Sequence, residues 1–319
     1  DRWQVAHIYR RRAKPEEQAP QYSHIHFTSD LDEVLNDPLV KLVVVCTHAD
    51  SHFEYAKKAL EAGKNVLVEK PFTPTLEEAK TLFALANSKG LTVTPYQNRR
   101  FDSCFLTTKK VIESGKLGEL VEIESHFDNY RPLAETNPGG PQNGEFYGLG
   151  VHTLDQIISL FGRPDHVSYD LRSLRNKANP DDTFEAQLFY GDMKAIVKTS
   201  HLVQIDYPKF IVHGHKGSFV KYGIDQQETS LKANIMPGEP GFGADDSVGE
   251  LVYVNEAGEM VREAVPLESG DYGRVYDALY ETLVNGQPNY VKETDVLTNM
   301  EILQRGFEQP SPATITLTR

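Results

Sequence analysis

Cysteine is scarce in this sequence of 319 residues, and its scarcity limits the sites that the chain can carry. The two cysteines, Cys46 and Cys104, form no Cys-x-x-Cys pair and no cysteine–histidine spacing of a zinc site. Cys46 closes an apolar run, where a buried free thiol is the usual interpretation. We therefore expect no metal site, and we expect a reducing compartment such as the cytoplasm.

Long apolar runs and a surplus of positive charge are also missing. No apolar stretch reaches the ~20 residues that a membrane-spanning helix needs. Lys and Arg total 33 against 46 Asp and Glu, so the formal net charge is −13. This charge repels phosphate backbones, so we expect neither a nucleic-acid partner nor a membrane partner. It is compatible with one anionic small molecule held in a locally basic pocket.

A nucleotide-binding α/β domain is predicted for residues 1–98. Apolar runs and helical segments alternate there at short spacing, which is typical of a doubly wound parallel sheet of the Rossmann type. The run at 42–46 is continuous and β-branched, as in a parallel strand covered on both faces. The predicted strands are 3–9, 42–46, 65–68 and 91–96, and the predicted helices are 30–36, 51–62 and 76–88, the last with a capping box of Thr75 and Glu78.

A second domain is predicted for residues 99–319. Its pattern is mostly strands followed by two late helices, which favours an α+β fold with a large, mostly antiparallel sheet and helices on one face. The predicted strands are 119–128, 166–174, 184–190, 193–202, 208–213, 218–222 and 313–318; the predicted helices are 102–114, 148–161, 272–285 and 294–306, with a loop at 129–147.

The open face of that second sheet predicts self-association. Helices on one side leave the other face to be covered by something else. The strands at 184–190 and 193–202 alternate partly, and we expect their apolar residues on the open face of a homodimer or higher homo-oligomer. These residues are Phe184, Leu188, Ile196 and Val197.

Lys70 follows a predicted buried strand, within the sequence Glu69-Lys70-Pro71. Ligands in open α/β sheets bind outside the carboxyl ends of the strands. A lysine there can hold a substrate hydroxyl and assist its proton transfer. On position alone, a surface lysine after a strand is an equally good interpretation.

His152 and Asp155 lie three residues apart in a predicted helix, so they share a face. A histidine with a carboxylate neighbour is a natural general acid or base near neutral pH. The alternative is a helix-start histidine that only packs. A metal role is weaker still, because no third ligand is spaced nearby.

Together these segments resemble the glucose–fructose oxidoreductase/inositol dehydrogenase/MocA family over essentially the whole chain. Glu69-Lys70-Pro71 is the most specific match, and His152-Thr153-Leu154-Asp155 matches the His-x-x-Asp of the family's active site. Residues 47–52 match its cofactor-contacting turn, although proline is more usual than His48, and residues 97–101 match the segment that leads out of the nucleotide domain. The cofactor contacts that the resemblance implies are Tyr9, Arg10, Arg11, Cys46, Thr47, His48, His52, Glu69, Lys70, Asn98 and Arg99.

Two features depart from the family pattern. The glycine-rich dinucleotide loop is absent and the strand at 3–9 matches the family's second strand, so we expect the first strand, turn and helix to lie outside this sequence. Many family members also carry Asp four residues before the active-site histidine, where this chain has Gly148. One carboxylate of the usual acid/base group is therefore missing from that position.

The resemblance implies an NAD(P)-dependent oxidoreductase that acts on CH–OH groups of a sugar, polyol or related cyclic alcohol. Lys70 and His152 are expected to contact the reacting oxygen, and Asp155 to orient substrate hydroxyls. Arg10 follows a strand where an arginine accommodates the 2′-phosphate of NADP, which favours NADP over NAD. The alternative for Arg10, Arg11 and Arg12 is a solvated basic run. The alternative function is a sensor of NAD(P) or sugar without turnover, which Gly148 supports.

Overall fold

The computed structural model describes residues 2–133 and 138–317, which form two compact units. One unit comprises residues 1–96 with 276–290, and the other comprises 97–275 with 291–319. The sequence predicted one boundary at residue 98, with everything after it in the second domain. The segment 276–290 differs from that prediction, because it belongs to the first unit. Residues 134–137 of the predicted loop and residue 318 of the last predicted strand lie outside the described residues.

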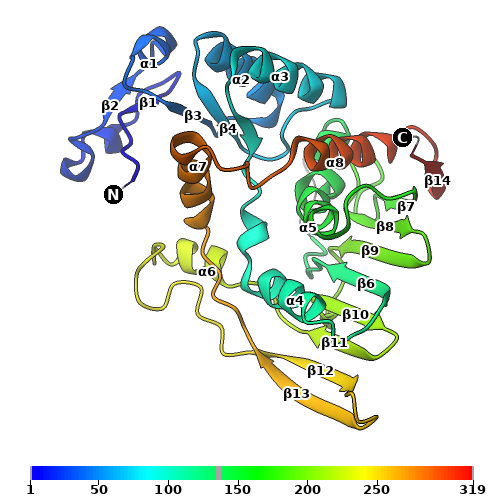
Figure 1. The fold of residues 1–319 in the computed structure, drawn as a ribbon. Helices are drawn as coiled ribbons and strands as arrows, with labels where there is room; N and C mark the ends of the chain where they lie inside the picture. The colour runs from blue at the N-terminus through cyan, green and yellow to red at the C-terminus, as the bar shows by residue number, and fades with distance from the viewer. Residues whose placement is uncertain (1, 134–137, 318–319) are drawn as a thin grey trace. The chain divides into compact units, whose positions relative to one another are not determined.

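The first unit contains a three-stranded parallel sheet whose strands alternate with helices (Figure 1). Its order is β3 (Leu42–Val45), β4 (Asn65–Val68), β5 (Val93–Pro95), with α2 (His52–Glu61) after β3 and α3 (Leu76–Lys89) after β4. The last three residues of β4 are completely buried, as expected for a central parallel strand. The predicted capping box begins α3. The strand–helix alternation predicted from the sequence is confirmed here.

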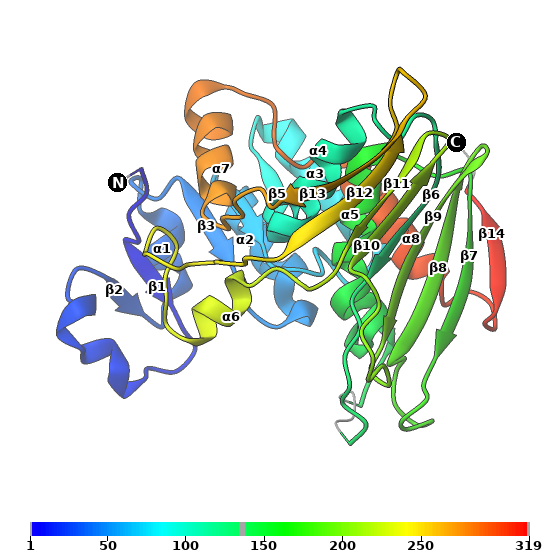
Figure 2. The same cartoon turned by 90° about the horizontal axis from the view of Figure 1, so that it is seen from below.

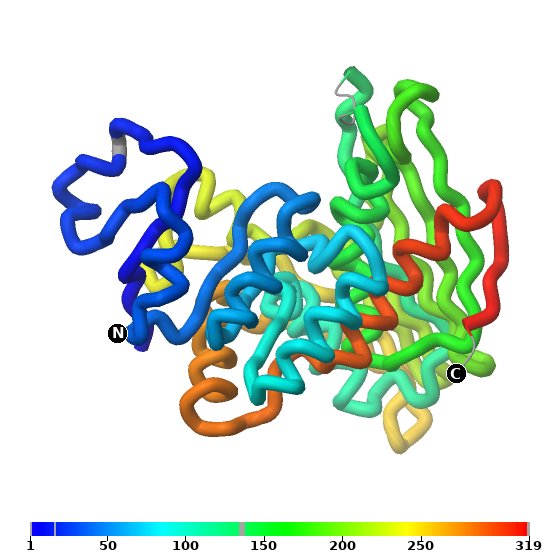
Figure 3. Tube along the Cα trace, turned by 90° about the horizontal axis from the view of Figure 1, so that it is seen from above, coloured from blue at the N-terminus to red at the C-terminus, as the bar shows by residue number. Residues whose placement is uncertain are grey.

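A separate parallel pair precedes this sheet. β1 (His7–Tyr9) and β2 (His26–Thr28) lie side by side, as the blue trace in Figure 3 shows, and α1 (Leu31–Asn36) follows them. The strand predicted over 3–9 is therefore shorter, and β2 was not predicted. Within the described residues no ladder joins β1 to β3, so the sheet predicted as continuous consists of two pieces. A strand is defined by its paired neighbour, and in the predicted strand the pairing register covers only residues 7–9.

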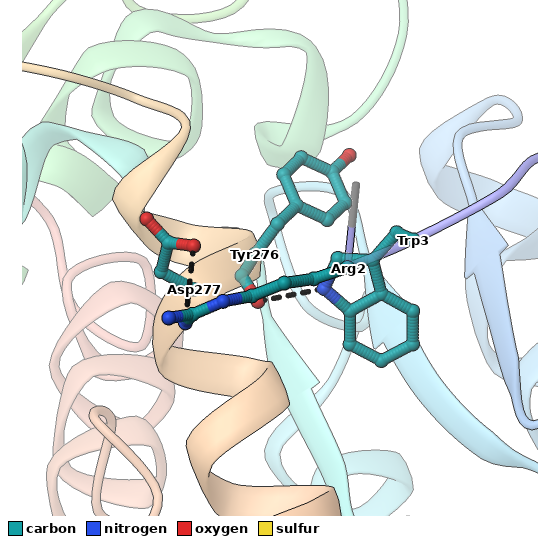
Figure 4. A pocket seen from close by; sticks show the side chains of 4 residues that line it. All are labelled: Arg2, Trp3, Tyr276 and Asp277. Atoms are coloured by element: carbon teal, nitrogen blue, oxygen red, sulfur yellow. Dashed lines mark hydrogen bonds and ion pairs between the residues drawn. The ribbon is translucent and has the colours of Figure 1, made fainter.

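Helix α7 (Arg274–Asn285) explains why a late segment joins the first unit. The Trp3 indole donates to the Tyr276 carbonyl oxygen at 2.8 Å, and Arg2 forms an ion pair with Asp277 at 3.4 Å. These four residues line a pocket of about 570 Å³ (Figure 4). Farther on, the Tyr290 hydroxyl donates to the Pro95 carbonyl oxygen at 3.1 Å. These contacts are tertiary, which is why a boundary drawn from sequence order alone misplaced 276–290.

The second unit is built on a nine-stranded sheet, which confirms the predicted large, mostly antiparallel architecture. All its neighbouring pairs are antiparallel except β6 with β9. Helix α4 contacts β11, α5 contacts β9, and α8 packs on α5, so helices cover one face (Figures 1 and 2). In sheet order the strands are β13 (Met260–Pro266), β12 (Val248–Val254), β11 (Gly217–Lys221), β10 (Phe210–Gly214), β6 (Leu120–His126), β9 (Met193–Ser200), β8 (Thr183–Tyr190), β7 (His166–Arg172) and β14 (Ala313–Thr316); the helices are α4 (Ser103–Glu113), α5 (Val151–Phe161), α6 (Gln227–Lys232) and α8 (Glu293–Arg305).

The two faces of this sheet correct one prediction. Phe184, Leu188 and Val197 are completely buried on the helix-covered face, and only Ile196 of the four predicted residues lies on the opposite face, partly exposed. The Phe184 ring packs 5.1 Å from the ring of Phe146. The prediction was wrong for three of four because alternation shows which residues share a face, not which face the helices cover.

The open face carries paired charges between its apolar residues. Lys194 pairs with Glu122 at 2.6 Å, and Lys198 pairs with Glu185 at 3.5 Å. Such a face is compatible with water and with a polar protein partner. Among the described residues, no helix combines the length and the apolar character needed to cross a membrane.

Two phenylalanines of one strand test the assignment of faces. Phe184→Ala should lower the free energy of unfolding by about 3–5 kcal/mol, because it empties a completely buried site. The matched change Phe189→Ala, on the opposite face of β8, should cost less than half as much, because that ring is partly exposed. Urea unfolding midpoints of the two variants measure the difference. Equal losses would show that both faces of β8 are equally well covered.

Candidate active site

The carboxyl ends of three parallel strands meet at one edge of the first unit's main sheet. Val45, Val68 and Pro95 are aligned in register at the ends of β3, β4 and β5. The Glu69 amide donates to the Val45 carbonyl oxygen at 2.8 Å, and the Tyr96 amide donates to the Val68 carbonyl oxygen at 2.7 Å. The predicted cofactor turn after β3 and the predicted Glu69-Lys70-Pro71 motif therefore lie at the same edge, where α/β sheets bind ligands.

The turn after β3 is open to solvent. Cys46, Thr47 and His48 are all exposed, so the prediction of a buried Cys46 thiol was wrong. Cys46 stands one residue beyond the last paired residue of β3, outside the strand's buried section. Partial enclosure and the nearby Glu69 carboxylate raise the pKa of the Cys46 thiol. A protonated thiol in this turn suits contact with a ligand better than nucleophilic chemistry.

His52 connects this turn to the Lys70 motif. Its side chain is buried, with Nδ1 2.8 Å from the Pro71 carbonyl oxygen and Nε2 3.0 Å from the Thr47 carbonyl oxygen. Both ring nitrogens are thus engaged by main-chain oxygens. We had expected His52 to contact the cofactor, and this geometry instead makes it a positioning residue that fixes the turns on either side.

Tyr276 is a residue at this edge that sequence reasoning missed. Its ring lies 6.3 Å from the ring of Tyr96. Burial raises the pKa of the Tyr276 phenol, and the negative charge of Glu69 adds to that rise. A neutral phenol beside the Glu69-Lys70-Pro71 motif can donate a hydrogen bond to a ligand. No local pattern could have found it, because it is brought there by α7 from the far end of the sequence.

The basic turn after β1 is partly held in place. Arg10 Nη1 pairs with Glu17 Oε1 at 3.0 Å, and the guanidinium lies 5.9 Å from the Phe27 ring centroid. The side chain of Arg11 is exposed. Tyr9 packs at 6.0 Å from the ring of Tyr55 on α2. These contacts fix the orientation of the Arg10 guanidinium. A phosphate bound there would accept hydrogen bonds from a guanidinium that is also paired with Glu17.

In the second unit, the predicted His152–Asp155 pair lies on α5, next to a single π-helical turn at Phe146–Gly150. His152 is 5% exposed and Asp155 is 2% exposed. Single π-helical turns occur frequently at functional sites, since they re-aim neighbouring side chains. The prediction that both residues share the start of one helix is confirmed.

Arg100 holds Asp155 in a bidentate ion pair. Its Nε and Nη2 donate to the two carboxylate oxygens of Asp155, both at 2.8 Å, and Nη2 also donates to Asp295 Oδ2 at 3.2 Å. Burial raises the pKa of Asp155, and the guanidinium opposes that rise. Both oxygens of Asp155 are thus committed to Arg100, so we assign Asp155 a positioning role rather than the expected contact with substrate hydroxyls.

Arg99 also differs from its prediction as a cofactor contact. It is buried within the second unit, paired with Glu228 at 2.8 Å and Asp102 at 3.4 Å, and its guanidinium lies 4.7 Å from the Phe127 ring centroid. Its neighbour Asn98 is partly exposed and keeps its predicted role as a proposal. In the described part of the chain, no group of three His, Cys, Asp or Glu residues is arranged to hold a metal ion.

Comparison with known proteins agrees with this two-part architecture. The model of the GFO/IDH/MocA oxidoreductase family's NAD-binding Rossmann fold matches residues 1–97, and the model of the family's C-terminal alpha/beta domain matches residues 109–316. The matched ranges follow one another along the chain and leave only residues 98–108 and the last three residues outside.

Individual relatives agree as well. The uncharacterised oxidoreductase YhhX of Escherichia coli is 83% identical over 319 residues, which cover 100% of this chain and 92% of the relative. The scyllo-inositol 2-dehydrogenase (NADP(+)) IolW of Bacillus subtilis is 33% identical, over 97% of this chain and 87% of the relative. A crystal structure of an oxidoreductase from Bacillus cereus is 49% identical, with a TM-score of 0.96 over 99% of this chain and 91% of that chain. The chain belongs to the GFO/IDH/MocA oxidoreductase family, with a Rossmann domain for a nicotinamide cofactor followed by an α/β domain.

Proposed function

We propose that this protein transfers hydride between NADP or NAD and a CH–OH group of a sugar, polyol or related cyclic alcohol. The observation that carries the proposal is Lys70, which stands at the carboxyl end of a buried parallel strand in the unit that matches the Rossmann domain. The relative IolW, a scyllo-inositol 2-dehydrogenase that uses NADP(+), supports a cyclic polyol as the substrate. Two free thiols support a reducing compartment such as the cytoplasm as the place of action.

The residues of this chain divide the work of alcohol oxidation between them. Lys70 and His152 contact the reacting oxygen, and one of them takes the hydroxyl proton. Asp155, held by Arg100, keeps the first turns of α5 and therefore His152 in a fixed orientation. The turn at Cys46, Thr47 and His48, together with Asn98, contacts the cofactor. When bound, the nicotinamide supplies the hydride chemistry, and the protein supplies position and charge.

A sensor that binds NAD(P) or sugar without turnover is the second candidate. The observation in its favour is Gly148, where many family members carry an aspartate. A carboxylate can be lost without penalty when catalysis is no longer needed. The presence of both Lys70 and His152 speaks against a sensor, because neither is required for binding alone.

Removing Lys70 should separate the two candidates. Lys70→Ala should lower the rate of polyol oxidation by roughly 100-fold or more while the protein stays folded, because the proton-transfer and hydroxyl-binding group is lost. Rates are followed by the absorbance of reduced nicotinamide over a panel of sugars and inositols. Lys80→Ala, an exposed lysine on α3, is the matched control and should keep full activity.

The pH dependence of the oxidation rate shows which residue takes the hydroxyl proton. The rate of oxidation should rise with pH through one ionisation, and His152→Asn should lose both that ionisation and most of the rate. An unchanged profile in His152→Asn would move proton transfer to Lys70 or water. Cofactor and polyol binding without turnover by the unaltered protein would favour the sensor.

Cofactor preference depends on the basic turn after β1. Arg10→Asp should weaken NADP binding by roughly tenfold or more and NAD binding much less, because only NADP places a phosphate beside the guanidinium. Arg12→Asp makes the same change of charge two residues away on an exposed side chain and should affect both cofactors equally. Calorimetric titration of both cofactors gives the four affinities. Equal weakening of NAD and NADP by Arg10→Asp would make Arg10 a surface charge paired with Glu17.

We also propose that the chain forms a homodimer or higher homo-oligomer through the open face of its nine-stranded sheet. The face carries partly exposed Ile196, Ile211 and Val220 on neighbouring strands, between the paired charges. Light scattering at micromolar concentration should give at least twice the mass of one chain, and Ile211→Asp should reduce it by placing an unpaired charge in the contact. A monomeric mass for the unaltered protein would contradict the proposal.

A further inference from the structure

Gly148 occupies the position where many family members carry an aspartate, and the Glu145 side chain lies beside it. A side-chain carbon built onto Gly148 would lie 3.2 Å from Oε2 of Glu145, closer than nearly all real contacts of that kind. The backbone of Gly148 is not in the left-handed region, so the conformation itself does not require glycine. The Glu145 carboxylate thus stands beside the position from which an aspartate side chain would project.

Glu145 lies just before the predicted acid/base residues along the chain. The π-helical turn at Phe146–Gly150 begins directly after Glu145 and leads into α5, which carries His152 and Asp155. A π-helical turn winds more widely than an α-helix, so residue spacing alone does not place the Glu145 side chain. The 3.2 Å approach of its Oε2 to the Gly148 position places its carboxylate where the aspartate is missing.

Asp181 and His201 are neighbours of Glu145. Asp181 accepts two main-chain hydrogen bonds here, and His201 lies beside the carboxylate. The Glu145 amide donates to the Asp181 carbonyl oxygen at 2.9 Å, and the next amide, of Phe146, donates to Asp181 Oδ2 at 2.7 Å. Oε1 of Glu145 lies 3.2 Å from Nε2 of buried His201, close enough for an ion pair but without hydrogen-bond geometry. Burial raises the pKa of Asp181 to about 7, so this neighbour adds less negative charge near neutral pH than an ordinary aspartate would. Oε2 of Glu145 is directed toward Gly148.

Exposure separates Glu145 from the buried carboxylates around it. Its side chain is 22% exposed, whereas Asp155 and Asp181 are almost completely buried; both oxygens of Asp155 accept from Arg100, and Oδ2 of Asp181 accepts from the Phe146 amide. Glu145 is thus a carboxylate beside Gly148 that a solute can reach. Such an arrangement suits a group that accepts a hydrogen bond from a ligand hydroxyl.

We propose that Glu145 supplies the substrate-facing carboxylate beside His152, in exchange for the aspartate that other family members carry at the position of Gly148. Its Oε2 accepts a hydrogen bond from a polyol hydroxyl, while Oε1 lies beside His201. Glycine at 148 follows from this arrangement, because a larger side chain would crowd the Glu145 carboxylate. Gly148 then no longer supports a loss of catalysis. The inference rests on the proposed polyol oxidoreductase function.

The test removes the Glu145 carboxylate and then adds a carboxylate at position 148. Glu145→Ala should lower kcat/KM for an inositol substrate by roughly 10- to 100-fold, since a hydrogen bond to a charged group is lost. The double variant Glu145→Ala/Gly148→Asp should recover most of that loss, because the truncated side chain leaves room for aspartate. Glu33→Gln, which breaks a Glu–His pair of similar length with His26 at 3.0 Å, should leave kcat/KM unchanged. Glu145→Ala with normal kcat/KM, or a double variant that folds without recovery, would overturn the proposal.

Two further measurements keep the test decisive. Glu145→Gln preserves size and a polar contact for His201, so it should show the same loss even if the double variant does not fold; normal activity in Glu145→Gln would overturn the proposal. Calorimetric binding of scyllo-inositol in the presence of cofactor is measured for every variant. If the unaltered protein binds the polyol but never oxidises it, the proposed hydride transfer is wrong. The role of Glu145 is then decided by polyol affinity, which should fall in Glu145→Ala and recover in the double variant. If no polyol binds the unaltered protein, both proposals fail.

Discussion

The second unit depends on the guanidinium of Arg100, which donates hydrogen bonds to two buried carboxylates. Asp155 on α5 and Asp295 on α8 are both almost completely buried, and Arg100 donates to each. Burying an unpaired carboxylate costs several kcal/mol, so neither helix could pack in this way without the arginine. Asn299 adds a second connection by donating to the Val151 carbonyl oxygen at 2.9 Å. This pairing fixes α5 against α8 and with it His152 at the beginning of α5, whereas Glu145 precedes the π-helical turn that leads into α5.

Much of the fold could be predicted because local pattern and tertiary structure agree in the buried elements. The apolar run of β4 and the capping box of α3 were found within a residue, since burial and end-capping leave direct marks on the sequence. Two of the missed strands carry no such marks. β13 alternates between exposed and partly exposed residues, as an edge strand does, and β2 is short with no buried residue. Phe184 and Leu188 were correctly placed on one face, yet the neighbouring Glu185 and Gln187 already indicated that the opposite face is the polar one.

The residues of the candidate site also fall into two groups: those that the sequence could identify and those that only the structure shows. Lys70 at a strand end and His152 at a helix start follow from position along the chain, so the sequence could find them. The partner of Asp155 could not be found, because Arg100 lies 55 residues earlier and no local rule pairs the two. Tyr276 likewise reaches the strand ends only through tertiary packing. Glu145 had a local signal, its spacing of three residues before Gly148, but only the structure shows that its carboxylate stands against that glycine.

The proposed chemistry is hydride transfer from a polyol carbon, and buried ionic contacts hold α5, which carries His152. The most direct measurement follows the hydride itself. An inositol labelled with deuterium at its ring carbons is incubated with the protein and oxidised cofactor, and the nicotinamide is then analysed by mass spectrometry and NMR. The account predicts that the reduced cofactor carries one deuterium on its nicotinamide ring and that the polyol becomes a ketone. Cofactor and polyol that both bind, with no deuterium transferred over prolonged incubation, would contradict it.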